Sequence, residues 1–199
     1  MDEVRFEIIE TIKEGISLGV KNIGPVIVNA LLWFVTVWIP YLNVGTTIGL
    51  FVGVVSKLSK GEPLSETEIF NPVYRKYMGE FFLTAGLLHV GVIIGLCFFI
   101  IPGLIIGIAW CLALLILIDK GKNPMEAISL SNQCTYGYKW RIFAIQFILA
   151  LVIGGINLLF GLFPFFIHMI LMIAVLLFAI FIDIGIKASI YRQLTQNIE

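Results

Sequence analysis

Residues 81–118 read FFLTAGLLHVGVIIGLCFFIIPGLIIGIAWCLALLILI, a stretch without Asp, Glu, Lys or Arg. An α-helix rises 1.5 Å per residue, so about 20 residues cross the roughly 30 Å hydrocarbon core of a bilayer. The stretch is too long for one such helix and long enough for two short ones. Pro102 lies near its middle, and proline lacks the N–H group that continues a helix. The stretch therefore predicts two membrane helices that form a hairpin with its turn at Pro102.

Two further stretches without charge have the same design. They cover residues 22–56 and 142–182, and Pro40 and Pro164 lie near their middles. The three prolines are equally spaced, since Pro102 lies as far along the chain from Pro40 as Pro164 lies from Pro102. The sequence thus predicts an all-α integral membrane protein whose six transmembrane helices form a bundle of three Pro-turned helical hairpins.

The composition of the whole chain agrees with this class. The 199 residues are 59% hydrophobic and only 13% charged, and the mean hydropathy is +1.01. A soluble globular domain carries about 25% charged residues, so an ordinary cytosolic enzyme and a disordered protein are excluded. The 13 Lys and Arg are balanced by 13 Asp and Glu, which leaves no basic field for binding nucleic acid.

The spacing of the prolines also indicates an internal repeat. Lys60-Gly61-Glu62-Pro63 follows the first turn at nearly the distance at which Lys120-Gly121-Lys122-Asn123-Pro124 follows the second. We therefore expect one membrane domain, residues 1–199, built on a pseudo-threefold repeat with a period of about 62 residues. Its units cover approximately residues 1–62, 63–124 and 125–186, and a cytoplasmic tail covers residues 187–199.

The positive charges predict the orientation in the membrane. All 13 Lys and Arg lie in the N-terminal arm, the two linkers or the tail, and none lies near a proline turn. Short loops rich in Lys and Arg stay on the cytoplasmic side, so both termini and both long linkers are expected there. The alternative is that the hairpins are re-entrant and turn inside the bilayer, where protein or water must surround the apex.

Segments outside the spans are expected to form cytoplasmic interfacial helices. Asn123 before Pro124, with Glu126 beyond it, is a typical helix start, because asparagine caps free N–H groups and proline suits the first turn. An amphipathic helix is also expected at the N-terminus, on the membrane or packed beneath the bundle. Its apolar residues recur every four positions, at Val4, Ile8, Ile12 and Ile16.

Several short strings resemble a known family. They are residues 101–110 (IPGLIIGIAW), Ile118-Asp119-Lys120, residues 123–131 (NPMEAISLS), residues 136–141 (YGYKWR) and Tyr191-Arg192-Gln193-Leu194. In this order they resemble uncharacterised prokaryotic six-span proteins that are related to the membrane domain of glycerophosphoryl diester phosphodiesterases. The resemblance covers nearly the whole chain and implies a multi-pass fold in the cytoplasmic (inner) membrane. It implies no activity, because the phosphodiesterase chemistry of the fused relatives sits in a separate soluble domain.

The sequence contains no recognisable catalytic or metal-binding constellation. A metal site needs converging His, Cys or carboxylate ligands, and the candidates fall at different depths relative to the proline turns: His89, His168, Cys97, Cys111 and Cys134. P-loop, Gly-x-Ser-x-Gly and His-Glu-x-x-His motifs are absent from the sequence. We therefore predict a protein that is not an enzyme and has no catalytic residues, cofactor or metal.

Polar residues within the predicted spans are the best pointer to function, because they are costly in hydrocarbon. Asn29 precedes Pro40 by nearly the distance at which His89 precedes Pro102, so both should sit at similar depth. With Gln146 they form a candidate intramembrane polar site. Such a site would bind a solute or respond to protons. Alternatively, interhelical hydrogen bonds worth about 0.6 kcal/mol each fix the packing.

Three charged residues are expected at one height, at the cytoplasmic end of the bundle. Lys57 and Asp119 follow the prolines of their hairpins at the same distance along the chain, and Asp183 follows its own at nearly that distance. They are candidates for a charge cluster that closes the bundle. The alternative is that each charge only marks the point where its helix leaves the lipid.

Two functions from different classes follow from these patterns. The first is a non-catalytic scaffold or accessory protein of the cytoplasmic membrane, with a protein partner on its cytoplasmic face. The alternative is a transporter or oligomeric channel for a small solute or lipid, with Asn29, His89 and Gln146 along the path. The lipid bilayer is a partner in both cases, a homo-oligomer is compatible with both, and nucleic acid is expected in neither.

Overall fold

A computed structural model describes residues 6–196, and all regular structure in this range is helical. Within this range, five helices are long and apolar enough to cross a membrane, and one bent pair would supply a sixth span. The five are Leu42–Lys60, Met78–Phe98, Ile100–Lys120, Lys139–Phe160 and Phe165–Leu194. The chain is therefore a polytopic membrane protein in contact with lipid, as the composition predicts.

The first hairpin begins with the bent pair. Helix α1 (Ile8–Lys21) is followed by α2 (Ile23–Thr36), and the chain bends by 79° between them. After the turn that contains Pro40, the chain continues as one helical run, composed of α3 (Leu42–Ile48), the π-helical segment η1 (Gly49–Val54) and α4 (Val55–Lys60). Because α2 has only 14 residues, it is about 21 Å long and too short to cross a bilayer alone.

The second hairpin turns just before its proline. Helices α6 (Met78–Phe98) and α7 (Ile100–Ala109) are separated by Phe99, whose backbone is extended. Pro102 is the third residue of α7, a position that tolerates proline because the first turn of a helix needs no N–H donor. A methyl group added to Gly95 would lie only 2.9 Å from the Cα atom of Gly103, so the two helices pack closely.

A break after α7 separates it from α8 (Ala113–Lys120). The linker helix α9 (Pro124–Thr135) supplies Ser131, whose hydroxyl donates to the Ala109 carbonyl at 2.8 Å and accepts from the Leu112 N–H at 3.2 Å. The backbone groups that the break leaves free are thus satisfied, as burial requires.

The remaining linkers and the third hairpin complete the chain. The start predicted for α9 is confirmed, because the Asn123 side chain accepts a hydrogen bond from the Glu126 N–H at 2.9 Å. Pro164 directly precedes the last helix. The other elements are the 3₁₀-helix η2 (Glu68–Phe70), α5 (Val73–Lys76), α10 (Lys139–Phe160) and α11 (Phe165–Leu194).

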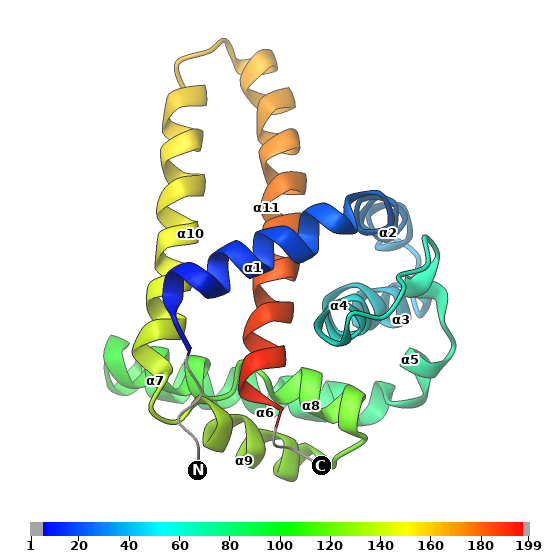
Figure 1. Ribbon diagram of the computed structural model, residues 1–199, viewed down its shortest axis with the longest axis vertical. Coiled ribbons are helices and arrows are strands. Elements are labelled where there is room, and N and C mark those ends of the chain that lie inside the picture. Colours follow the sequence, from blue (N-terminus) through cyan, green and yellow to red (C-terminus); the bar gives the residue numbers. More distant parts are fainter. Residues whose placement is uncertain (1–5, 197–199) are drawn as a thin grey trace.

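The three hairpins point in different directions. In Figure 1, α10 and α11 stand upright, α7 crosses the lower end of α10, and α2 and α4 are seen almost end-on. The structure therefore has three diverging hairpins that meet in a common core, an arrangement that the predicted hairpins alone did not specify. The largest buried side chains of this core include Ile48, Leu50, Leu58, Ile116, Leu117, Ile186 and Ile190.

The hairpin tips lie outside the core and are apolar. Trp38, Phe99 and Leu162 are 79%, 78% and 85% exposed at the three tips. Burying a large apolar side chain stabilises a protein by about 1.5–3 kcal/mol relative to exposure to water. Exposed apolar and aromatic side chains of this kind are typical of a surface that contacts lipid or the membrane interface.

Small residues bring α1 against α11. The buried residues of α1 are Thr11, Gly15 and Gly19, each one turn apart. A methyl group on Gly15 would lie 2.7 Å from the Cα atom of Ile186, and one on Gly185 would overlap the Gly15 carbonyl. Glycine at such positions lets two helix backbones approach closely.

The predicted apolar stripe of α1 is therefore only part of its contact face. Ile8 and Ile12 pack against the core, but Ile16 is 40% exposed. Val4 lies outside the described residues. The small residues of α1 form the interface with α11, because they allow a shorter distance between the helix axes than isoleucine does.

We predict that Gly185→Ala lowers the thermal unfolding temperature in detergent, because the new methyl group forces the backbones apart, at a cost of about 1–3 kcal/mol. The matched control is Gly154→Ala in α10, where an added methyl group meets nothing within 4 Å. The control should be neutral or slightly more stable, because alanine favours helices over glycine. Equal stability of the two variants would contradict the close contact.

Candidate functional site

Asp119 joins the core ends of the three hairpins. It lies near the end of α8, and its side chain is 4% exposed. On α4, the Ser56 hydroxyl donates a hydrogen bond to Oδ1 and the Lys60 ammonium pairs with the same oxygen. On α11, the Tyr191 hydroxyl donates to Oδ2 at 2.9 Å. One carboxylate thus connects α4, α8 and α11.

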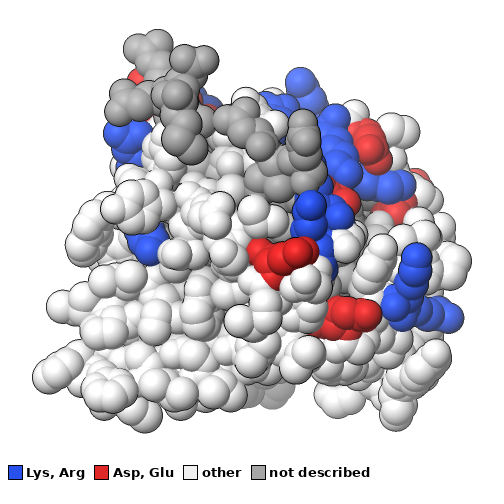
Figure 2. All heavy atoms as spheres, turned by 90° about the horizontal axis from the view of Figure 1, so that it is seen from below, with Lys and Arg blue, Asp and Glu red and all other residues white. Residues whose placement is uncertain are grey.

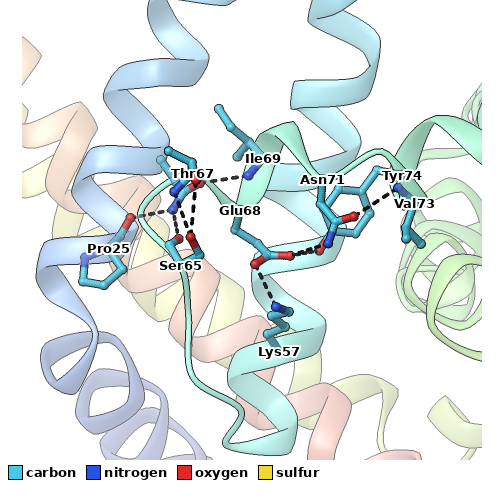
Figure 3. A network of polar contacts seen from close by, with 10 residues as sticks. Pro25, Lys57, Ser65, Thr67, Glu68, Ile69, Asn71, Val73 and Tyr74 are labelled. Atoms are coloured by element: carbon cyan, nitrogen blue, oxygen red, sulfur yellow. Dashed lines mark hydrogen bonds and ion pairs between the residues drawn. The ribbon is translucent and has the colours of Figure 1, made fainter.

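Glu68, in the linker helix η2, is a second buried carboxylate, with a side chain that is 3% exposed. Lys57 Nζ lies 2.8 Å from its Oε2. The Tyr74 hydroxyl and the Asn71 amide donate to Oε1 at 2.7 and 3.3 Å. Figure 3 shows Lys57 reaching the carboxylate from one side, and Asn71 and Tyr74 from another. These bonds fasten the first linker to α4.

Asn29 fastens the same linker to α2. Its side chain is fully buried. The amide nitrogen donates to the carbonyls of Pro25 and Ser65, both at 2.8 Å, and the amide oxygen accepts from the Ile69 N–H at 3.0 Å. Figure 3 shows Pro25, Ser65 and Ile69 around this point. Both amide N–H groups and the carbonyl oxygen of Asn29 are therefore used.

Glu14 holds α1 to the end of α11. Its Oε2 accepts hydrogen bonds from the Ser189 hydroxyl at 2.6 Å and the Gln193 amide at 2.8 Å, and Arg192 pairs with Oε1. We refer to Glu14, Glu68, Asp119 and their hydrogen-bond partners as the polar layer. Each acid bonds through both of its oxygens, so the three acids act as anchors between elements that are distant in sequence.

The local field around Glu68 favours its ionised form. Burial raises the pKa of Glu68, but hydrogen bonds from Lys57, Tyr74 and Asn71 outweigh burial and hold that pKa below its ordinary value. The pKa of Tyr74 is raised, first by burial and then by its hydrogen bond to Glu68. Glu68 therefore stays an anion and Tyr74 stays a neutral donor, which is the pairing that the geometry needs.

The structure gives the three residues of the predicted charge cluster separate partners. Lys57 pairs with Glu68, Asp119 pairs with Lys60, and Asp183 pairs with Lys187 at 2.6 Å. Lys57 and Asp119 both lie in the polar layer but contact different groups. The predicted cluster is therefore replaced by three separate ion pairs, because each side chain meets the residues that pack against its own face of the helix.

The predicted intramembrane polar site is likewise divided. Asn29 bonds to the first linker, as described above. The exposed His89 lies with Nδ1 2.6 Å from the carbonyl of Ala85, one turn earlier in its own helix. Gln146 lines two cavities beside α10. The structure thus does not bring the three residues together.

Figure 2 shows where the charges lie on one face of the molecule. Lys, Arg, Asp and Glu lie mainly over the upper and right-hand parts of this face, and its lower left part is uncharged. The polar layer and these charged parts follow from the same fact, that Lys and Arg are confined to linkers and helix ends. In a membrane, such a surface faces headgroups and water, while the uncharged surface faces lipid.

Sequence reasoning missed Glu68, Tyr74, Ser56 and Glu14 as parts of one polar layer. Glu68 and Glu14 are ordinary acids of a linker and a terminal arm when only the sequence is considered. A signal existed for two other members, since Asp119 and Tyr191 both lie in strings that carry the family resemblance. Nothing in the sequence, however, indicated that the two residues touch.

Comparison of the chain with protein-family profiles, with characterised proteins and with solved structures gives no match.

We predict that Asp119→Asn and Tyr191→Phe each lower the thermal unfolding temperature in detergent, because a hydrogen bond to a charged group is worth about 1.5–3 kcal/mol. The double variant should lose less than the sum of the two, since both changes remove the same bond. As a control, Lys57→Met combined with Asp119→Asn should be additive, because the two residues have different partners. Additivity in the first pair would disprove the Asp119–Tyr191 contact.

We also predict a pH-dependent contribution from Glu68. Because its pKa is lowered in the folded protein, its stabilisation is present above the ordinary carboxyl pKa and is lost as the pH falls through the lowered value. The difference in unfolding temperature between wild type and Glu68→Gln should therefore be large at neutral pH and shrink below about pH 4. Glu66→Gln, a change of an exposed acid in the same linker, should show little difference at either pH. A constant Glu68 effect across this range would contradict the prediction.

Proposed function

We propose that this protein is a non-catalytic scaffold or accessory protein of the prokaryotic cytoplasmic membrane. The observation that supports the proposal is the polar layer, in which three acids bond through both oxygens to groups from distant elements. Side chains committed in this way rigidify the core end of the hairpins. A rigid, charged platform attached to apolar hairpins suits the presentation of a surface to a partner protein.

The orientation belongs to the same proposal. We infer that both termini, both linkers and the polar layer face the cytoplasm, because short loops rich in Lys and Arg remain there. The three hairpins are proposed to be units of a pseudo-threefold repeat. The equal spacing of Pro40, Pro102 and Pro164 supports this, as does the position of each proline close to the start of a helix. We further propose that the chain is related to the membrane domain of glycerophosphoryl diester phosphodiesterases.

Cysteine accessibility tests the orientation. The test uses a chain whose natural cysteines are replaced by alanine. Tyr41→Cys or Leu162→Cys then reports the hairpin tips, and Glu66→Cys or Lys122→Cys reports the linkers. An impermeant maleimide added to intact cells should label the tips, whereas the linkers should react only after permeabilisation. Linkers labelled in intact cells would contradict the orientation. Tips that react from neither side would establish the re-entrant alternative.

Purification tests the scaffold function. A partner should co-purify in fixed stoichiometry after mild detergent extraction. Reversal of charges that lie outside the polar layer and are exposed (Glu66) or half-buried (Lys122) should release it. Lys122→Glu and Glu66→Lys are suitable changes. Leu162→Ala, at a hairpin tip, is the matched control and should retain the partner. Purification of the protein alone, together with solute flux in liposomes, would overturn the proposal.

A second candidate is the transport of a small solute or lipid, and one observation favours it. Two cavities of about 230 and 280 Å³ share Gln146 as a lining residue. The larger is also lined by Asp183 and the smaller by Lys187, the two partners of one ion pair. Transport predicts flux in liposomes that falls in Gln146→Leu and is unchanged in His89→Ala.

A further inference from the structure

An apolar cavity opens where α7 crosses the beginning of α10. Its volume is about 380 Å³, within the range of about 300–1,000 Å³ that is usual for small-ligand sites. One wall is a single face of α7, including Leu104 and Ile108, and the other wall includes Trp140 and Phe143 of α10. Figure 1 shows the two helices crossing at this place.

The walls of this cavity match a hydrocarbon chain. Leu104 is 44% exposed, although a large aliphatic residue at a helix crossing would ordinarily be covered. Phe143 and Trp140 pack edge to face, with 6.0 Å between their ring centroids, and together form an aromatic wall. A flexible acyl chain that fills the cavity would cover this apolar surface without requiring a hydrogen bond.

The mouth of the cavity is charged, in contrast to its apolar walls. Lys139 is the charged residue among those that line it. Its Nζ lies 3.1 Å from Oδ1 of Asn132, a neutral acceptor, and it forms no ion pair within residues 6–196. An ammonium group has three donors, so two remain for a ligand. Arg141, two residues on, is by contrast committed to the Phe6 carbonyl at 2.7 Å and lies over the Tyr138 ring.

Aromatic residues place this mouth at the level of lipid headgroups. Tyr136 and Trp140 both line the cavity and are 77% and 78% exposed. Tyrosine and tryptophan concentrate at the membrane–water interface, where the ring lies in the apolar region and the polar atom reaches headgroups. A chain in the cavity and a headgroup at Lys139 are thus compatible with one ligand.

We propose that the cavity between α7 and α10 is a binding site for one anionic phospholipid, with an acyl chain against Leu104 and Ile108 and the phosphate beside Lys139. The headgroup class follows from charge. The lining contains a cation and no acid, so a headgroup of net negative charge is favoured, and an acid that would pair with choline is missing from the lining residues. This site is independent of the proposed scaffold function.

Native mass spectrometry of the full-length protein tests the site. The protein is equilibrated with vesicles of equimolar phosphatidylglycerol and phosphatidylcholine that have identical chains, and the retained lipids are counted. Wild type should retain phosphatidylglycerol over phosphatidylcholine by about fivefold, the effect expected of one lysine near a lipid surface. Lys139→Gln should bring this ratio close to one, and Lys139→Arg should keep it. Leu104→Trp should reduce retention of both lipids.

The matched control is Lys122→Gln, which removes a positive charge from the loop before α9 and does not line the cavity. It should keep the wild-type ratio, and the variants at Lys122 and Lys139 should unfold at temperatures close to wild type. Loss of the preference in Lys122→Gln as well would indicate diffuse attraction to positive charge and overturn the site. A Lys139→Gln ratio equal to wild type would also overturn it, as would a second protein copy retained in place of lipid. Even if Leu104→Trp fails to fold, the comparison of Lys139→Gln with Lys139→Arg tests whether Lys139 selects an anionic headgroup.

Discussion

The carboxylate of Asp119 is the interaction on which the arrangement of the helices depends. A buried charge is costly unless its lone pairs accept hydrogen bonds and an opposite charge lies nearby. Ser56 and Lys60 of α4 and Tyr191 of α11 supply these groups to an acid on α8. Each of the three hairpins contributes one of these helices, so the hairpins meet at this point and are free to diverge beyond it.

The rest of the polar layer repeats this solution around the core. Glu68 fastens the first linker to α4, and Glu14 fastens α1 to α11. Asn29, outside the polar layer, fastens the same linker to α2. Glycine contacts between α1 and α11 then bring the backbones together where the bonds between side chains hold the helices. The protein therefore concentrates its directional interactions at the core end of the hairpins and leaves their apolar surfaces to the lipid. A charged platform and a set of apolar hairpins are consequences of this division.

The separation of the polar layer from the apolar hairpins also assigns two kinds of function, partner binding and ligand binding, to different parts of the molecule. The polar layer uses its donors and acceptors internally, which favours a supporting role for this end. The cavities beside α10 retain polar groups with capacity for a ligand, at Gln146 and at Lys139. Ligand chemistry is thus expected along α10, and partner binding is expected on the charged face.

The sequence by itself determined the class, the helices and the approximate turns. Long charge-free stretches with central prolines are expected to form helical hairpins, because backbone N–H and C=O groups in hydrocarbon must form hydrogen bonds within the protein. The start of α9 could also be predicted from the sequence, since the Asn123 cap is a local interaction. Only the tertiary structure decided that the hairpins diverge, that Lys57 pairs with Glu68 and not with Asp119, and that Asn29 bonds to the first linker whereas His89 bonds within its own helix. The physical reason is that helix periodicity fixes how far along a helix a residue lies, whereas its partner depends on which neighbour packs against that face.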